Sequence, residues 1–80
     1  MKTKIEIFVI DKAKEKRTEK KYSQVELAEL LGVSSGFIGK VESPKYPTKY
    51  NLNHINKLAI IFNCSPKEFL PSTIGDPNEN

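Results

Sequence analysis

The sequence has few of the residues that build disulfides, metal sites and catalytic sites. It contains one cysteine, Cys64, and one histidine, His54. A lone cysteine excludes an internal disulfide, and one cysteine with one histidine cannot supply the ligand set of a structural zinc site. No Ser/His/Asp set, phosphate-cradling loop or HExxH motif is present. We therefore expect no catalytic residue, no metal and no cofactor, with His54 in a capping or surface role and Cys64 as a packing residue.

Long apolar runs are also missing. The most apolar stretch near the start covers residues 5–10, and Glu6 interrupts it. The core of a signal peptide needs about 7–15 apolar residues, and a membrane-spanning helix needs about 20. The single cysteine fits a reducing compartment. These features predict a cytoplasmic, non-enzymatic protein with no membrane partner.

The net charge is positive and unevenly distributed. Residues 1–70 carry 13 basic and eight acidic residues, a net charge of +5, whereas residues 71–80 carry two acids and no base. A basic domain favours an anionic partner, although charge alone does not identify it. The segment from Lys12 to Lys21 interleaves acids at helical spacing, which is typical of a solvated face.

Residues 5–20 contain neither glycine nor proline and predict a first helix. Val9 and Ala13 share one face of that helix. The alternation of Ile5, Ile7 and Val9 also fits a strand, but a lone strand in so short a chain has nothing to pair with. We therefore favour a helix.

Residues 23–43, SQVELAELLGVSSGFIGKVES, predict two short helices joined at a glycine. Ser23 and Glu26 form the S-x-x-E capping box that begins the first of them. Gly32 fits the left-handed position after a helix, and Ser34 is expected to cap the second. This is the helix-turn-helix pattern, whose second helix enters the major groove in its DNA-binding versions. From periodicity alone, two adjacent helices of an ordinary all-α domain fit equally well.

Two further helices are predicted over residues 51–70. Asn51 can cap a helix through LNHINKLAIIF, and Asn63 can end it in the left-handed conformation. Ser65 and Pro66 then begin a last short helix, with Glu68 closing a second capping box. Together the patterns predict five short helices.

The run SQVELAELLGVSSGFIGKVE resembles the lambda-repressor-like, Xre/Cro-type helix-turn-helix domains. The segment KLAIIFNCSPKEFL is similar to their fourth and fifth helices, so that the resemblance covers about residues 9–71. It implies a compact, all-α, five-helix domain, here residues 1–71, followed by a flexible tail, residues 72–80. It also implies a sequence-specific regulator of transcription, within that class a repressor, that binds double-stranded DNA with its third helix in the major groove.

The resemblance also implies phosphate contacts at individual positions. Gln24, at the start of the second helix, matches a glutamine that binds a DNA phosphate, where helix amides also attract an anion. Ser34 matches a second phosphate contact. The loop after the third helix grips the DNA backbone in this family, which here assigns Lys45, Tyr46 and Lys49.

The outward face of the third helix matches the positions that face DNA bases. In this sequence they are Ser35, Gly36, Gly39 and Lys40. Relatives often carry Gln, Arg or Asn at the two glycine positions, side chains that hydrogen-bond bases. Two interpretations stay open for the bare positions. Either the helix backbone lies deeper in the groove, with specificity left to Ser35, Lys40 and DNA shape, or this face reads little sequence.

Arg17 and Glu42 match a pair that in many relatives forms a salt bridge between the first helix and the end of the third. The loop between Glu42 and Ala59 departs from the family because it is longer, with two prolines and two tyrosines. Of these tyrosines, we expect Tyr46 to contact DNA and Tyr50 to pack in the core.

A lone domain of this size buries little surface on DNA, so the resemblance favours a homodimer on a palindrome. The candidate dimer surfaces are Ile7 and Phe8 of the first helix, and the C-terminal turn with Phe69, Leu70 and Ile74. An alternative from another class is a protein-interaction module. An antitoxin that holds a toxin is one example, with DNA binding secondary or lost.

Overall fold

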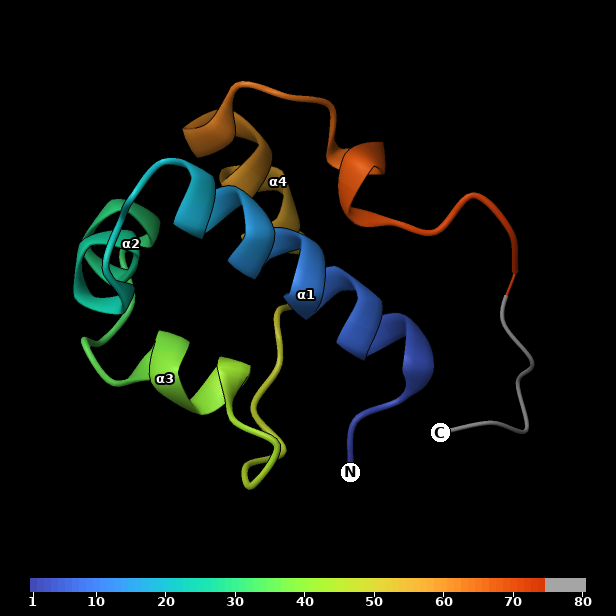
Figure 1. The fold of residues 1–80 in the computed structure, drawn as a ribbon, viewed down its shortest axis with the longest axis horizontal. Coiled ribbons are helices and arrows are strands. Elements are labelled where there is room, and N and C mark those ends of the chain that lie inside the picture. The colour runs from blue at the N-terminus through green and yellow to red at the C-terminus, as the bar shows by residue number, and fades with distance from the viewer. Residues whose placement is uncertain (75–80) are drawn as a thin grey trace.

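The structure, a computed structural model shown in Figure 1, describes residues 1–74. Within this part of the chain there are four α-helices and one 3-10 helix: α1 (Lys4–Glu19), α2 (Gln24–Leu31), α3 (Phe37–Glu42), α4 (Leu52–Phe62) and η1 (Pro66–Phe69). The predicted all-α class is confirmed. The predicted fifth α-helix is wrong, because Pro66–Phe69 forms a single 3-10 helix. Residues 75–80 of the expected tail lie outside the described residues.

Helix α1 runs across the middle of the molecule, with α2 and α3 at one end and η1 at the other (Figure 1). It begins at a capping box in which Thr3 Oγ1 accepts from Glu6 N, and Glu6 Oε1 accepts from Thr3 N at 2.8 Å. Its buried side contains Val9, Ile10 and Ala13, and it contacts both α3 and η1. None of the helices in residues 1–74 has the length and apolar character needed to cross a membrane.

Helix α4 is capped at both ends by side-chain and backbone signals that the sequence predicts. Asn51 Oδ1 accepts from His54 N at 2.8 Å, and Asn51 N donates to His54 Nδ1 at 3.1 Å. His54 therefore has the capping role that we expected. Asn63 ends the helix with a φ of 52°, in the left-handed region where asparagine is favoured.

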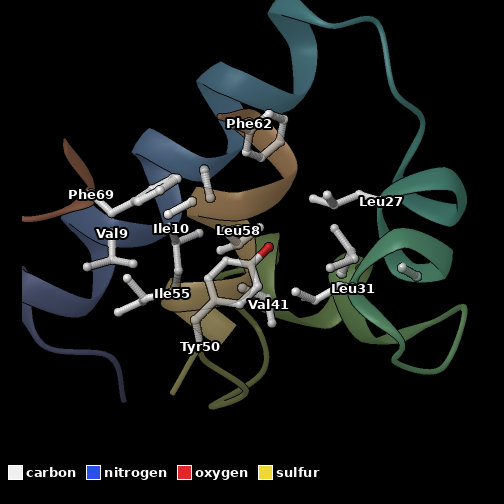
Figure 2. Packing of buried hydrophobic residues seen from close by; sticks show 14 residues of the cluster. Val9, Ile10, Leu27, Leu31, Val41, Tyr50, Ile55, Leu58, Phe62 and Phe69 are labelled. Carbon is white, nitrogen blue, oxygen red and sulfur yellow. The ribbon is translucent and has the colours of Figure 1, made fainter. Parts of the chain in front are cut away.

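One hydrophobic core joins all of these elements (Figure 2). It is built from 14 buried residues, and fully burying each large side chain contributes about 1.5–3 kcal/mol. Tyr50 belongs to this core, as predicted, and Cys64 packs partly buried against it. Phe69 is fully buried in it, so its assignment to a dimer surface is wrong.

The start of η1 differs from the predicted capping box. In the tight 3-10 turn, Glu68 N already donates to the carbonyl oxygen of Ser65 at 3.0 Å. Ser65 Oγ therefore accepts from Lys67 N at 3.3 Å, one residue earlier than a capping box requires. Glu68 Oε1 accepts from Lys16 Nζ at 3.0 Å, which ties η1 to α1 at the surface.

Candidate nucleic-acid interface

Helices α2 and α3 pack against each other around a tight turn. Ser23 and Glu26 form the predicted capping box at the start of α2, with Ser23 Oγ accepting from Glu26 N at 3.0 Å. Gly32 ends α2 with a φ of 77°, a left-handed conformation that favours glycine. Ile38 and Val41 then anchor α3, because both are fully buried in the core. The helix-turn-helix geometry is thus set by local caps and by two buried residues.

Helix α3 begins two residues later than the sequence predicts. Ser34 does not cap it; instead the carbonyl oxygen of Ser34 accepts from Phe37 N at 3.0 Å and forms a turn. Gly36 occupies the N-cap position, with a φ of −86°, and no side chain caps the helix. Gly36 thus precedes the helix, and Gly39 is the glycine inside it.

The outward side of α3 and the loop behind it form a polar surface. Ser35 and Lys40 are exposed, and so are Lys45 and Tyr46 in the loop. Lys40 Nζ lies 5.8 Å from the centre of the Tyr46 ring, a cation–π contact that holds two predicted DNA-contacting side chains together. We call this group of four residues the α3 surface.

A salt bridge lies behind the α3 surface. Arg17 Nε and Nη2 each donate to a carboxylate oxygen of Glu42 at 2.9 Å, a two-pronged geometry. Arg17 Nη1 also donates to the carbonyl oxygen of Tyr22 at 2.8 Å. The side chains of Arg17 and Glu42 are only 11% and 4% exposed, so the pair is largely withdrawn from solvent. It connects α1, the segment before α2, and the end of α3.

Gln24 joins this salt bridge from the first position of α2. Its Nε2 donates to Glu42 Oε1 at 3.0 Å, while the residue stays exposed. The structure therefore places the predicted phosphate-binding amide between α2 and α3, with a partner that sequence analysis did not identify.

Lys2 is a second contact that sequence analysis missed. Its Nζ donates to the carbonyl oxygens of Val41 and Ser43, at 2.5 and 2.7 Å. These carbonyls belong to the C-terminal end of α3, where a cation is favoured by the helix dipole and satisfies carbonyls that the helix leaves free. Because 39 residues separate Lys2 from Val41, no local pattern signals this bond.

The third predicted phosphate contact in the loop is engaged elsewhere. Lys49 Nζ lies 2.6 Å from Glu6 Oε2 of α1, and this contact is the main reason that the pKa of Glu6 is lowered. The structure thus does not gather Lys49 with Lys45 and Tyr46. Beside that pair, an open groove of about 470 Å³ lies between the N-terminal residues, including Lys2, and the loop after α3.

A family model described as helix-turn-helix matches residues 14–69. The chain belongs to the helix-turn-helix family. The match includes all of α2, α3, α4 and η1, so the family relationship rests on the whole unit rather than on one motif. The resemblance to lambda-repressor-like, Xre/Cro-type domains is thereby confirmed.

Solved helix-turn-helix structures are similar to this chain. The restriction-modification controller protein C.AhdI from Aeromonas hydrophila is 31% identical, with a TM-score of 0.66 over 80% of this chain and 94% of that chain. The N-terminal DNA-binding domain of SinR from Bacillus subtilis is 25% identical, with a TM-score of 0.66 over 84% and 96%. The hypothetical transcription factor NHTF from Neisseria, 22% identical, has the same fold with a TM-score of 0.71 over 84% and 75%. No curated protein sequence matches the chain.

Proposed function

We propose that this protein is a sequence-specific regulator of transcription, within that class a repressor, that binds double-stranded DNA with α3 in the major groove. The observation that carries the proposal is that α3 has one apolar, buried side and one side that adjoins a polar, exposed surface. Ile38 and Val41 are fully buried on one side, and the other side leads into the polar, basic α3 surface. The relatives that are named a controller protein and a DNA-binding domain support the same class of function.

Binding would begin with electrostatic attraction between the basic chain and the DNA phosphates. Backbone contacts then fix the register of the protein on the duplex, and contacts to base edges supply specificity. We propose that Ser35, Gly36, Gly39 and Lys40 face the base edges, with the contacts made by Ser35 and Lys40. For the phosphates we propose Gln24, Ser34, Lys45 and Tyr46. Lys49 can contact a DNA phosphate only if its ammonium group leaves the ion pair with Glu6.

The proposed functional unit is a homodimer in the cytoplasm, without catalytic activity. A two-fold dimer would place two α3 helices in major grooves about 34–36 Å apart on a palindromic site. Ile7, Leu70 and Ile74 of the predicted dimer surfaces are exposed, by 43%, 42% and 97%, while Phe8 is partly buried. Leu52, which is 81% exposed at the start of α4, extends the choice of apolar contacts for a second copy.

Binding of labelled random-sequence duplex DNA over a salt series tests this function. We expect log affinity to fall linearly with log salt, as it does when phosphate contacts release counterions. Lys45→Ala should reduce the slope by about one. Lys67→Ala is the charge-matched control, since Lys67 is exposed on η1, at the opposite end of the molecule from α3 (Figure 1), and should leave the slope unchanged.

Selection of bound sequences from a random duplex library then tests specificity. The wild type should enrich one palindromic site, and Lys40→Ala should relax the preference at the positions that Lys40 contacts. Absence of binding at about 50 mM salt would overturn the DNA-binding function. A protein partner, such as a toxin, would then be the function to test.

A further inference from the structure

The two glycines at the start of α3 have different surroundings. A Cβ atom added at Gly36 would meet no atom within 4 Å. A Cβ atom added at Gly39 would lie 3.3 Å from Gln24 Oε1 and 4.0 Å from its Cδ, a tight contact with the amide group. The side chain of Gln24 therefore passes directly over the bare position of α3.

The contact with Gln24, which only Gly39 makes, gives a reason for a glycine at this position inside a short helix. Glycine weakens a helix interior relative to alanine, so its presence at residue 39 needs a compensating role. The space next to Gly39 is occupied by the amide oxygen of Gln24, while the Nε2 of the same amide donates to Glu42 Oε1 at 3.0 Å. An alanine methyl group at residue 39 would stand 3.3 Å from the amide oxygen, so the amide of Gln24 would have to shift by a few tenths of an ångström.

The amide that crosses Gly39 keeps capacity for a ligand. The NH2 group of glutamine has two hydrogens, and the bond to Glu42 uses one of them. Gln24 is exposed at the first position of α2, where backbone N–H groups of a helix attract an anion. The group most suited to this place is a phosphate oxygen of DNA.

We propose that Gly39 is a positioning residue for Gln24: its missing side chain makes the space in which Glu42 holds the amide ready for a DNA phosphate. The role in binding rests on the proposed function, whereas the packing of Gln24 over Gly39 does not. Gly39 thus contributes to DNA binding through Gln24, and contact of its own backbone with the groove is not required.

A double-mutant cycle tests the proposal, with Gly39→Ala, Gln24→Ala and the two combined. Gly39→Ala should fold and should weaken binding of random-sequence duplex about three- to tenfold, the scale of one ordinary hydrogen bond. Gln24→Ala should weaken it by at least as much. In the Gln24→Ala background, Gly39→Ala should have no further effect, because there is no amide left to displace.

A second measurement reports on the amide without DNA. The side-chain NH2 resonances of Gln24, assigned by their loss in Gln24→Ala, should move in Gly39→Ala and stay in place in Gly36→Ala. Gly36→Ala is the matched control for this spectrum because its methyl group meets no neighbouring atom.

The outcomes separate the proposal from the function on which it rests. Equal weakening by Gly39→Ala in both backgrounds would indicate a clash of the methyl group with DNA and would overturn the proposal. Unmoved Gln24 resonances in Gly39→Ala would also overturn it. If the wild type binds no DNA, the proposed function and the phosphate role of Gln24 fall together, while the spectra still decide whether Gly39 makes space for the amide.

Discussion

Helix η1 and helix α3 are attached to the rest of the molecule by different kinds of contact. η1 contacts α1 and α4. Its Phe69 is fully buried in the core, and its polar bond between Glu68 and Lys16 lies at the surface. α3 also has two fully buried residues, but a largely buried salt bridge between Arg17 and Glu42, joined by the exposed Gln24, adds to them. We refer to these as the apolar junction (Phe69 with the core) and the polar junction (Arg17, Gln24 and Glu42).

The apolar and polar junctions differ in how closely they fix the orientation of a helix as well as in how strongly they hold it. Apolar burial is roughly proportional to area and is not directional, so it stabilises a helix without fixing its rotation closely. Two-pronged hydrogen bonds between a guanidinium and a carboxylate hold both groups in one geometry. The polar junction is therefore suited to fixing how α3 is presented to DNA, and the apolar junction to keeping the domain folded.

The largest expected effect comes from breaking the apolar junction. Phe69→Ala should lower the free energy of unfolding by about 3–5 kcal/mol, because it leaves a cavity in the core. Urea denaturation measures the change, and Leu70→Ala, at a 42% exposed neighbour, is the control and should cost much less. At a temperature where the variant is folded, its DNA affinity should match the wild type. A loss below about 1 kcal/mol would contradict the assignment of η1 to the core.

Breaking the polar junction should cost less stability and more DNA affinity. Glu42→Ala leaves Arg17 largely buried without its carboxylate, and removing one partner of a buried pair costs about 3–5 kcal/mol. We expect about 3 kcal/mol, since Arg17 keeps its bond to Tyr22. Glu68→Ala, which breaks an exposed pair, is the control and should cost under about 1 kcal/mol.

DNA affinity separates the two junctions more sharply than stability does. Among folded molecules, Glu42→Ala should weaken binding of duplex DNA, because Gln24 and α3 lose a shared partner. Equal affinities of folded Glu42→Ala and folded Phe69→Ala would show that the polar junction does not orient α3.

The sequence predicts the features that depend on neighbouring residues. The caps at Ser23 and Asn51, and the left-handed stops at Gly32 and Asn63, are set within one helical turn, and the structure contains all four. The start of α3 is different. Ser34 has the residue type of a cap, but the backbone turn from Ser34 to Phe37 takes its place.

Contacts between distant residues are the part that the sequence alone does not predict. Lys2 reaches the end of α3 across 39 residues, and Gln24 crosses Gly39 only after α2 and α3 have packed together. Phe69 is assigned by sequence to a surface rather than to the core for a related reason: an apolar residue in a terminal turn fits a core and an interface equally well.

Tyr50 carries a polar atom into the hydrophobic core. Its Oη is buried, and within the described residues it has no hydrogen-bond partner. An unpaired buried hydroxyl costs about 1–3 kcal/mol, so Tyr50→Phe should stabilise the protein by about 1–2 kcal/mol. Thermal unfolding measures this change. A destabilised Tyr50→Phe would show that the hydroxyl has a favourable partner after all.

The same residue should make the wild type sensitive to high pH. Burial raises the pKa of Tyr50 above its usual value. The unfolded chain then loses the phenol proton first, so stability is complete below pH 10 and falls as pH rises above about 10. Tyr50→Phe should lack this part of the decrease.

The smallest expected effect is at His54, where α4 meets α3. The ring of His54 lies 5.1 Å from that of Phe37 in α3, and its Nδ1 accepts the capping bond from Asn51 N. Partial burial lowers the pKa of His54, so the unfolded chain takes up the proton first. Stability is therefore complete above about pH 6.5 and is lost as pH falls through the lowered pKa.

Protonation of His54 removes the acceptor of the capping bond, and a helix cap contributes about 1 kcal/mol. Thermal unfolding at about pH 7.5 and 5.5 should show lower stability at the lower pH in the wild type, by at most the contribution of the cap. His54→Gln keeps a residue that can close the capping box and does not titrate, so it should show a smaller loss. If both lose stability equally, the loss comes from another group, and the contact between α4 and α3 does not depend on the charge of His54.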